Sequence, residues 1–470
     1  MDYDLVVDGA PTKVTLDEEK ITFKSHDTTS FSYQLNDVIG CDEIVTGWFS
    51  KTDVTRIWFI EHGPSNYFLK KCKTVCGDQR KRFQQDLTEK TIKYTKRPKR
   101  LLVLINPIGG SGSAKKYFRD IVQPVFKLAG ISLDVIFTEH AGHMIDIAKT
   151  YDFSNTSGVA LLGGDGSYHE VVNVLMRRRQ EEQGVDINDQ NATLSPVDIP
   201  ITLIPTGTGC GLTEYNTGCK DILTSCLHVI KGRTVPCHLL ALYSSGKLLG
   251  FGGTGCSYGF MTDNLYYSDR MFRWLGRIRY FVVPIWLFLF KSQKNRPFDA
   301  KVMCYASVTE RLNSENNKTE IFVEDKKLLG HHSYTSDTVT FKRKLWNLMV
   351  FNINAMIDGK VVFDVPGMYV PKPDTCTSFF FYGDVSARAM FRFLKNIVTR
   401  APMDVTNNEL EAINIQGLKT EVTDSCDRQE REMTLLKRLV QLDGEMYQLD
   451  SPSFQLWYKL DVVQIFSSYL

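Results

Sequence analysis

The first 76 residues alternate apolar and polar positions in short runs. Segments such as DLVV, KITFKS and TRIWFIE repeat with a period of two, which is typical of strands that bury one face. Asp8-Gly9 is a turn signal between two of these runs. Residues 78–97 are polar, with apolar residues at a helical spacing. The positions available for the buried stripe of this helix are Phe83, Leu87 and Ile92. We therefore expect many short strands followed by one closing helix.

From Leu101 onward, continuous apolar runs alternate with helix-like segments. The runs are LLVLIN, ISLDVIFTE, GVALLGG and DIPITLIPTG. Continuous apolar runs are typical of strands that are covered on both faces. Strands that alternate with helices indicate a parallel, doubly wound sheet. We expect this α/β lobe to span residues 99–237.

Beyond residue 237 the period-two alternation returns, and few segments have a helical pattern. This predicts a β-rich sandwich lobe of two packed sheets over residues 238–470. Residues 405–437 are polar and charged, as expected of a surface insertion. The whole pattern predicts a multidomain α/β plus β protein, in which a β module at residues 1–98 precedes the two lobes.

Composition narrows the class of protein. The 470-residue chain has 56 Lys+Arg against 54 Asp+Glu, and its net charge of +2 excludes a generally basic nucleic-acid binder. The 11 cysteines include no CxxC pair, which favours free thiols in a reducing compartment, with a zinc site near Cys72 and Cys76 as the alternative. The N-terminus, MDYDLVVDGA, has no basic region followed by an apolar one, so we expect no secretory signal.

Three segments raise the question of membrane contact. The longest apolar run, residues 280–290, contains Pro284 and is far shorter than the roughly 20 residues of a spanning helix. It is either core of the last lobe or the lining of a lipid acyl pocket. The basic residues 93–100 are either a solvated linker or a contact for an anionic membrane. The basic amphipathic segment MFRFLKNIVTR, residues 390–400, is a packed helix, a membrane contact or a calmodulin-type target. We expect a cytoplasmic protein with peripheral membrane association.

Glycine clusters follow three strands of the α/β lobe, at residues 106–112, 163–166 and 205–209. In open α/β sheets, ligands bind beyond the carboxyl ends of the strands. Glycine lets backbone N–H groups approach an anion, and the following helix N-terminus adds a favourable dipole. One cluster alone is compatible with a tight turn, but three in successive strand-to-helix turns predict a phosphate-binding crevice. These turns contain no GxxxxGK[ST], GxGxxG or GxSxG motif, which excludes the familiar P-loop, dinucleotide and hydrolase sites.

The second cluster carries a carboxylate, Asp165, where a strand gives way to a helix. As a structural residue it would cap the helix. As a functional residue it would accept the proton of a hydroxyl that attacks a bound phosphate. Glu170, one turn further on, is either a solvated helix residue or a contact for the nucleotide or its metal.

The last lobe holds further candidates in the segment GFMTDNLYYSDRMFRWLGRIRY. Arg273 and Arg279 are suited to the charge of a triphosphate, although their spacing does not share one helical face, so a bend near Gly276 is required. Near the C-terminus, Asp443-Gly444 lies between two alternating strands, which is the pattern of a hairpin turn.

The motifs NPIGGSG, TEHAG, LGGDGSYHEVVN, IPTGTG and DGE occur in the order typical of the diacylglycerol-kinase catalytic superfamily, which the chain resembles from about residue 99 to 470. The resemblance extends to its ceramide-kinase and sphingosine-kinase-like members, and is closest to the former through KRPKRLLVLINP, KDILTSCLHVIKG and RWLGRIRY. The N-terminal strands and closing helix are similar to a pleckstrin-homology β-barrel, a lipid- or membrane-binding module, although the usual tryptophan is absent from this helix.

The resemblance implies an ATP-dependent lipid kinase that phosphorylates the primary hydroxyl of ceramide, with ATP and Mg²⁺ as cofactors and Asp165 as general base. The residues implied to hold the nucleotide, between the two lobes, are Asn106, Pro107, Ile108, Gly109, Gly110, Thr138, Glu139, His140, Ala141, Gly142, Glu170, Thr206, Gly207, Thr208, Arg273, Arg279, Asp443, Gly444 and Glu445. Those implied for the lipid are Gly163, Gly164, Asp165, Gly166, Asp263 and Leu265. No side chain is assigned as a direct metal ligand.

One position in the sequence, Leu265, bears on which lipid is the substrate. Sphingosine-kinase-like sequences place a second aspartate two positions after the one matching Asp263, where it can meet a cationic amine. Here that position is Leu265, which suits a neutral amide and favours ceramide over sphingosine, while diacylglycerol stays open. Two departures from the family pattern are Cys210 in place of the usual Asn and an added residue between Ser268 and Arg273. A non-catalytic lipid-sensing protein that keeps the fold is therefore the alternative.

Overall fold

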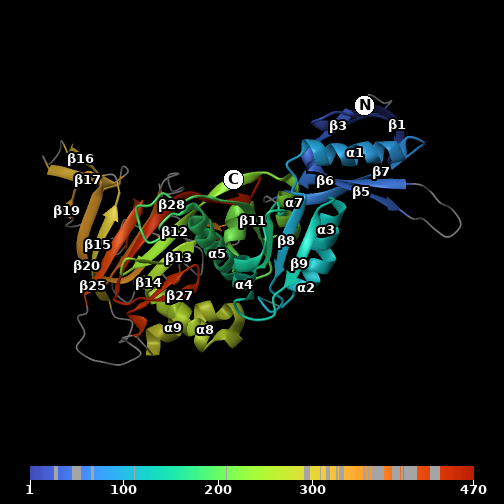
Figure 1. Cartoon of the computed structure of the whole chain (residues 1–470). Coiled ribbons are helices and arrows are strands. Elements are labelled where there is room, and N and C mark those ends of the chain that lie inside the picture. The colour runs from blue at the N-terminus through green and yellow to red at the C-terminus, as the bar shows by residue number, and fades with distance from the viewer. Residues whose placement is uncertain are drawn as a thin grey trace. The chain divides into compact units, whose positions relative to one another are not determined.

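A computed structural model describes the chain over residues 1–25, 30–44, 54–64, 68–110, 112–207, 209–290, 297–306, 308–313, 318–323, 326–327, 333–352, 356–357, 360–361, 375–383, 392, 395, 410–423 and 435–469 (Figure 1). The chain divides into two compact units. The first unit comprises Met1–Tyr168, Asp198–Pro236 and Gln464–Leu470. The second unit comprises His169–Val197 and Cys237–Val463.

The N-terminal part of the first unit is an antiparallel sheet with the strand order β4-β3-β2-β1-β7-β6-β5. Its strands are β1 (Asp2–Val7), β2 (Ala10–Leu16), β3 (Lys20–Ser25), β4 (Ser30–Gln34), β5 (Val38–Ile44), β6 (Val54–His62) and β7 (Phe68–Cys76). The helix α1 (Arg80–Tyr94) follows them and buries Phe83 and Leu87 among the strand residues, as predicted. The third residue of the expected stripe, Ile92, is instead 50% exposed.

The rest of the first unit is a parallel sheet, as predicted. Its strands are β8 (Arg100–Ile105), β9 (Ser132–Phe137), β10 (Val159–Gly163) and β11 (Val197–Pro205), in the order β9-β8-β10-β11. The connections hold α2 (Ala114–Tyr117), η3 (Phe118–Val122), α3 (Gln123–Leu128), α4 (His143–Thr150), α6 (Gly211–Thr217) and α7 (Ile222–Lys231), and the first turn of α5 (Asp165–Gln183) follows β10. The chain leaves β8 toward β9 on one side and continues with β10 on the other. This makes the β8–β10 boundary a topological switch point.

The two parts of the first unit share one apolar core. Ile39 and Phe68 from the N-terminal sheet are buried with Val103 of β8 and Val229 of α7. Arg97, expected in a solvated or membrane-binding linker, instead donates hydrogen bonds to the carbonyls of Val38, Ile39 and Ala129. Burial lowers the pKa of its guanidinium to about 10. The guanidinium of Arg97 thus binds backbone carbonyls, while the other basic residues of this stretch, Lys93, Lys96, Lys99 and Arg100, are exposed.

The second unit is β-rich. An antiparallel path runs β27-β26-β14-β20-β15-β25-β28, and β23 and β24 extend from β20. The longer strands are β12 (Thr234–Ser244), β13 (Lys247–Gly252), β14 (Gly255–Gly259), β15 (Phe298–Tyr305), β20 (Thr338–Phe351), β23 (Cys376–Tyr382), β24 (Leu410–Ile415), β25 (Gly417–Thr423), β26 (Leu439–Leu442), β27 (Glu445–Gln448) and β28 (Ser453–Phe466). Shorter strands are β16 (Val308–Asn313), β17 (Lys318–Val323), β18 (Lys326–Lys327), β19 (Ser333–Tyr334), β21 (Met356–Ile357) and β22 (Lys360–Val361). The prediction of a β-rich lobe is confirmed.

The polar segment 405–437 contains two core strands. Leu410 and Ile413 of β24 and Leu418 of β25 are buried, and β25 pairs with both β15 and β28. The prediction of a surface insertion is wrong for these strands, because their apolar residues alternate with polar ones that dominate the composition. Of the helix predicted at 390–400, all but Arg392 and Lys395 lies outside the described residues.

Three helical segments follow β14: α8 (Phe260–Arg270), η4 (Arg273–Ile278) and α9 (Arg279–Phe290). Gly276 leaves the helical region with φ 58° and ψ −135°, so the bend required between the two arginines is present. Within the described residues, no helix combines the length and the apolar character needed to cross a bilayer.

Candidate functional site

The three glycine-rich turns of the first unit lie together. The parallel register pairs Leu162 with Ile105 and Gly163 with Pro205, which aligns the carboxyl ends of β8, β10 and β11. The turns also bond directly to one another. The amides of Thr206 and Gly207 donate to the carbonyl of Gly163 at 3.0 and 2.8 Å. The turns therefore form one surface at the switch point of the sheet, where α/β proteins bind their ligands.

Close backbone packing explains the glycines in these turns. A Cβ on Gly207 would lie 2.5 Å from the Cα of Gly164, and one on Gly110 would lie 2.9 Å from the Cα of Gly207. Gly110 also has a φ of +62°, which disfavours other residues. The glycines thus allow three chain segments to meet and leave their amides close to the edge of the sheet.

The first turn is shaped by the side chain of Asn106. Its Oδ1 accepts hydrogen bonds from the amides of Ile108 and Gly109 at 3.2 and 2.9 Å. This Asx-type geometry closes the turn locally. Because the oxygen of Asn106 serves the turn, its contribution is to shape the loop rather than to offer that oxygen to a ligand.

The TEHAG segment begins at the same edge of the sheet. The amide of Thr138 donates to the carbonyl of Ile105 at 2.9 Å, which links the ends of β8 and β9. Gly142 has a φ of +79° and precedes α4. His143 Nδ1 accepts from the amide of Glu139, and its ring stacks on that of His140 at 4.7 Å. Sequence reasoning did not predict this role for His143.

Asp165 is the first residue of α5 and is half-buried. Its two carboxylate oxygens accept hydrogen bonds from the amides of Gly211 and Leu212 at 3.0 and 3.2 Å. These amides belong to the first turn of α6. Asp165 therefore caps a different helix from the one expected, and this contact orients its carboxylate beside the three turns.

Two further residues distinguish the third turn. Cys210 adopts the left-handed region with φ 54°, is buried, and directs its thiol to the carbonyl of Gly163 at 3.6 Å. Asn tolerates this backbone region better than other residues with a Cβ, which accounts for Asn as the usual residue here. The hydroxyl of Thr206 is buried without a hydrogen-bond partner in the described structure. Thr208 lies outside the described residues.

In the second unit, Asp443 and Gly444 form the turn between β26 and β27, with φ values of +56° and +91°. The carboxylate of Asp443 accepts hydrogen bonds from Gly253 N, Thr254 N, Thr254 Oγ1 and Gly255 N at 2.6, 2.8, 2.6 and 3.2 Å. Burial acts to raise the pKa of Asp443, but hydrogen bonds from His169 and Thr254 hold the pKa below its ordinary value. The predicted hairpin turn is confirmed. The carboxylate of Asp443 already accepts hydrogen bonds from residues 253–255 of the protein.

The carboxylate of Glu170, in the second unit, is partly desolvated and lies near another carboxylate. Burial, and then the charge of Glu445, raise the pKa of Glu170, while His169 acts in the opposite direction. Glu445 is exposed, directly after the Asp443-Gly444 turn. Of the DGE motif, the glutamate is thus the residue that faces outward.

The candidate lipid-binding residues lie on α8. Asp263 is buried, and desolvation raises the pKa of its carboxyl well above the ordinary value. Leu265 is half-buried. Residues two positions apart point to opposite sides of an α-helix, so Asp263 and Leu265 do not present one continuous surface.

The two arginines differ in environment. Arg273 is exposed, whereas Arg279 is mostly buried and pairs with Asp269 at 2.8 Å. The guanidinium of Arg279 also donates to the hydroxyl of Tyr280 at 2.7 Å, while its Nε is buried without a partner in the described structure. This Nε is a donor suited to an anionic group.

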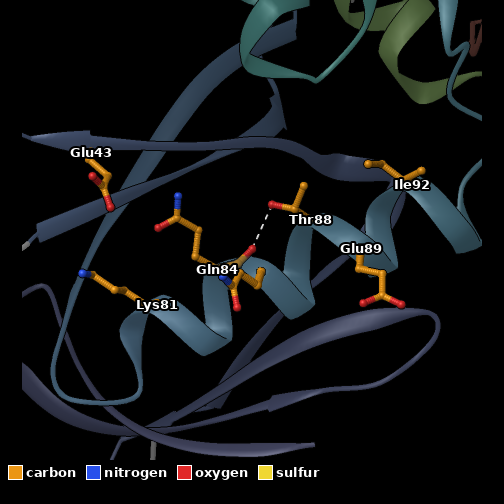
Figure 2. A pocket seen from close by; sticks show the side chains of 7 residues that line it. Glu43, Lys81, Gln84, Thr88, Glu89 and Ile92 are labelled. Atoms are coloured by element: carbon orange, nitrogen blue, oxygen red, sulfur yellow. Dashed lines mark hydrogen bonds between the residues drawn. The ribbon is translucent and has the colours of Figure 1, made fainter.

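A groove of about 580 Å³ lies elsewhere, on the outer side of α1 (Figure 2). Its lining residues are Glu43, Lys81, Gln84, Gln85, Thr88, Glu89 and Ile92. None of them belongs to the predicted site, and most are polar. The exposed side chain of Ile92 faces this groove. The groove contains none of the residues predicted to bind phosphate.

Part of the chain matches a known family of catalytic domains. Residues 100–242 match the diacylglycerol kinase catalytic domain family. The matched region contains all three glycine turns, the TEHAG segment, Asp165 and Cys210. A crystal structure from Bacillus anthracis str. Sterne, provisionally named as a diacylglycerol kinase, superposes with a TM-score of 0.51 at 14% identity, over 79% of this chain and 98% of that chain. This superposition shows a similar fold over 79% of this chain.

Among individual relatives, human ceramide kinase is 36% identical over 196 residues, which covers 42% of this chain and 36% of that protein. Human sphingosine kinase 1 is 31% identical over 194 residues, which covers 39% of this chain and 47% of that protein. The chain thus spans between a third and a half of the length of these relatives. The aligned part resembles both proteins at similar identity, so it does not separate their substrates.

Proposed function

We propose that this protein is an ATP-dependent lipid kinase that phosphorylates the primary hydroxyl of ceramide. The observation that carries the proposal is the meeting of three glycine turns and the Asp165 carboxylate at the switch point of the parallel sheet. Backbone amides at such a point bind phosphate groups. A carboxylate beside them is suited to accept a proton from an attacking hydroxyl.

The residues present fit a nucleoside triphosphate. Gly110 and Gly207 let neighbouring turns pack backbone against backbone, and the hydroxyl of Thr206 is buried without a hydrogen-bond partner in the described structure. We assign the phosphate contacts to residues 106–110 and 206–207. The amides of Asn106, Ile108, Gly109, Thr206 and Gly207 are bonded within the protein, so among the described residues the amide of Gly110 and the hydroxyl of Thr206 are the donors proposed for a phosphate. A Mg²⁺ ion bound to the phosphates would neutralise the charge that develops during transfer. Glu170, Arg273, Arg279 and Glu445 belong to the second unit and are proposed as its nucleotide contacts.

In the proposed reaction Asp165 takes the proton of the lipid primary hydroxyl. The hydroxyl oxygen forms a bond to the γ-phosphorus as the bond from that phosphorus to the β-phosphate oxygen breaks, and ADP leaves. The two amides that hold Asp165 fix the direction of its carboxylate. The hydroxyl therefore meets a base whose position is set before the lipid binds.

Ceramide is proposed over sphingosine for electrostatic reasons. Asp263 has a raised pKa, and a neutral carboxyl can donate a hydrogen bond to an amide but offers no counter-charge to an ammonium group. Leu265 adds no charge on the other side of α8. The absence of a counter-charge at both positions suits the acylated amine of ceramide better than the free amine of sphingosine.

A membrane surface is the proposed partner. The residues Ile278, Val282, Ile285 and Leu289 follow helical spacing and are exposed, by 54% and 63% for the last two. Val283 and Leu287 on the other side of α9 are buried against α8 and its neighbours. The segment 280–290 thus combines core residues with an exposed apolar face, and Arg270 and Arg273, which precede it in the chain, are exposed. This pattern is typical of a helix that lies at a lipid interface.

The N-terminal sheet is proposed as a pleckstrin-homology-like module. Two antiparallel meanders, β1–β4 and β5–β7, are joined through the β1–β7 pair and followed by α1. That order supports the resemblance. Its lipid-binding role remains part of the proposal, together with the three-domain division at residues 98 and 237 and the two-sheet arrangement of the β-rich lobe.

A three-lipid assay tests the function directly. The purified chain is incubated with labelled ATP, Mg²⁺ and mixed micelles that contain ceramide, sphingosine or diacylglycerol. We expect phosphate mainly on ceramide. Phosphate mainly on sphingosine would refute the argument from Asp263 and Leu265. Phosphate mainly on diacylglycerol would show a lipid kinase of the same superfamily with a different substrate. Lipid binding without transfer to any of the three would favour the non-catalytic alternative.

A further inference from the structure

His169 is a buried side chain for which the sequence motifs suggest no role. It directly precedes Glu170 on α5 and is 5% exposed. Its Nδ1 lies 3.3 Å from Oδ2 of Asp443, and its Nε2 lies 2.7 Å from the hydroxyl of Tyr447. The imidazole therefore bridges α5 to the turn and to strand β27 of the β26–β27 hairpin, all within the second unit.

One tautomer satisfies both contacts. With the proton on Nδ1, the ring donates to the carboxylate of Asp443, and Nε2 accepts from the Tyr447 hydroxyl. Burial, and then the charge of Asp443, raise the pKa of Tyr447 to about 12, so this hydroxyl remains a donor at neutral pH. Gly250 leaves room for the hydroxyl, since a Cβ there would collide with it.

The two ends of this bridge are held independently. Asn173 on α5 donates to the carbonyls of His169 and Phe251, and its oxygen accepts from the amide of Phe251 at 2.8 Å. These bonds fasten α5 to β13. At the other end, Asp443 accepts from the connection between β13 and β14. His169 and Asn173 thus connect α5 to the β26–β27 hairpin and to β13, and Asp443 connects the hairpin to the segment between β13 and β14.

We propose that His169 and Asp443 form a buried positioning pair that sets where Glu445 lies relative to Glu170, and that Glu445 alone in the DGE motif contacts the nucleotide. The inference rests on the proposed function for the presence of ATP. Asp443 cannot serve as an outward ligand, because its carboxylate is buried among donors from the protein. Glu445 follows it on the exposed side of the turn and is close enough to raise the pKa of Glu170.

Variants of the pair and of Glu445 test this division of roles. The full chain carries His169→Gln, Asp443→Asn, both together, or Glu445→Gln. His228→Gln is the matched control, because His228 is also buried and its Nδ1 accepts from a backbone amide, that of Ser468, in the first unit. The measurements are the Kd of a fluorescent ATP analogue, the unfolding midpoint, and kcat and KM for ATP.

We expect His169→Gln to weaken ATP binding about tenfold and to raise KM for ATP while kcat changes little, since the pair positions a binding residue. Asp443→Asn should act alike, and the double variant should be no worse than the more severe single variant. Glu445→Gln should weaken ATP binding without lowering the unfolding midpoint. His228→Gln should lower the midpoint and leave the Kd of the ATP analogue unchanged.

Two results would overturn the proposal. One is a His169→Gln protein that unfolds earlier, as His228→Gln does, with the wild-type Kd for the ATP analogue. The other is a Glu445→Gln protein with normal ATP binding beside an Asp443→Asn protein that has lost it, which would make Asp443 the ligand. A wild-type chain that does not bind the analogue would refute the proposed function itself.

Discussion

Asp165 has two roles in the proposed site. It caps α6, and it is the proposed general base. In Asp165→Asn, the amide can still accept one of the two backbone hydrogen bonds but cannot take a proton. We expect turnover to fall by about 10²- to 10⁴-fold, a stability loss of about 1 kcal/mol, and ATP-analogue binding near the wild-type value.

The matched control for this prediction is Asp221→Asn. Asp221 caps α7 through Thr224 N at 2.7 Å and has no place in the proposed site. It should lose similar stability while keeping its turnover per folded molecule. Equal activity losses in the two variants, measured against the folded fraction, would reduce Asp165 to a structural cap.

Cys210 carries backbone strain at residue scale, because a side chain with a Cβ occupies a left-handed position. Asn is more tolerant of this region, and its amide can donate to the Gly163 carbonyl in place of the thiol. We expect Cys210→Asn to raise the free energy of unfolding by roughly 0.5 kcal/mol. Chemical denaturation measures this. Cys226→Asn, a buried change within the regular helix α7, should instead be destabilising. Destabilisation of both to the same degree would contradict the strain argument.

Glu170 makes the stability of the protein depend on pH. Its folded-state pKa is raised above the ordinary value of 4.5, so the folded state holds the proton more tightly than the unfolded state does. Stability from this group is present below pH 4.5 and is lost as pH rises through the raised value. We expect Glu170→Gln to be more stable than wild type at neutral pH, with a difference that shrinks toward pH 4.5 in urea unfolding. A difference independent of pH would contradict this origin.

At the scale of elements, the three turns depend on backbone contact between them. A methyl group on Gly207 would press against the Cα of Gly164 at 2.5 Å, and neither segment can yield without moving a strand end. We expect Gly207→Ala to cost about 1–3 kcal/mol of stability and to weaken ATP binding. Gly211→Ala is the control in the same loop region, since its Cβ would meet only Asp165 Oδ2 at 4.0 Å. Matching behaviour of both variants in thermal unfolding would show that the turns do not pack as described.

Elements with a strong local pattern could be predicted from the sequence, and elements without one could not. The strands β8, β10 and β11 follow from continuous apolar runs, and the β26–β27 hairpin follows from Asp443-Gly444. In contrast, β24 and β25 could not be predicted, because they lie in a mostly polar segment and only part of each strand is apolar. Their burial comes from pairing with strands that are distant in the sequence. The bend at Gly276 was anticipated from the spacing of two arginines, and the structure confirms it.

At the scale of the whole molecule, membrane contact is proposed to depend on the exposed face of α9. Replacing Ile285 and Leu289 by Glu would place two charges on this face without touching the buried Val283 and Leu287. We expect this double variant to lose most of its sedimentation with anionic vesicles and to raise KM for the lipid, with ATP binding unchanged. Leu460→Glu is the control, as its side chain is 47% exposed on β28. Normal vesicle binding by the double variant would exclude α9 as the contact.

This experiment uses the full chain for a physical reason. The N-terminal sheet shares its core with the parallel sheet through Ile39 and Phe68, and Arg97 joins the two by hydrogen bonds to backbone carbonyls. Residues 1–98 alone would expose this apolar surface to water. Vesicle binding by such a fragment would report on the exposed core as well as on a native lipid-binding surface.

The sequence by itself determined the alternation of strands and helices, the glycine turns after three strands and the identity of the chemical groups near them. These features depend on local backbone geometry and hydrophobic period, which neighbouring residues specify. Only the tertiary structure decided that Asp165 caps α6, that His169 contacts Asp443, and that Arg97 bonds to backbone carbonyls. Each of these contacts joins residues far apart in the chain, and the energy of such contacts depends on which surfaces fold against each other.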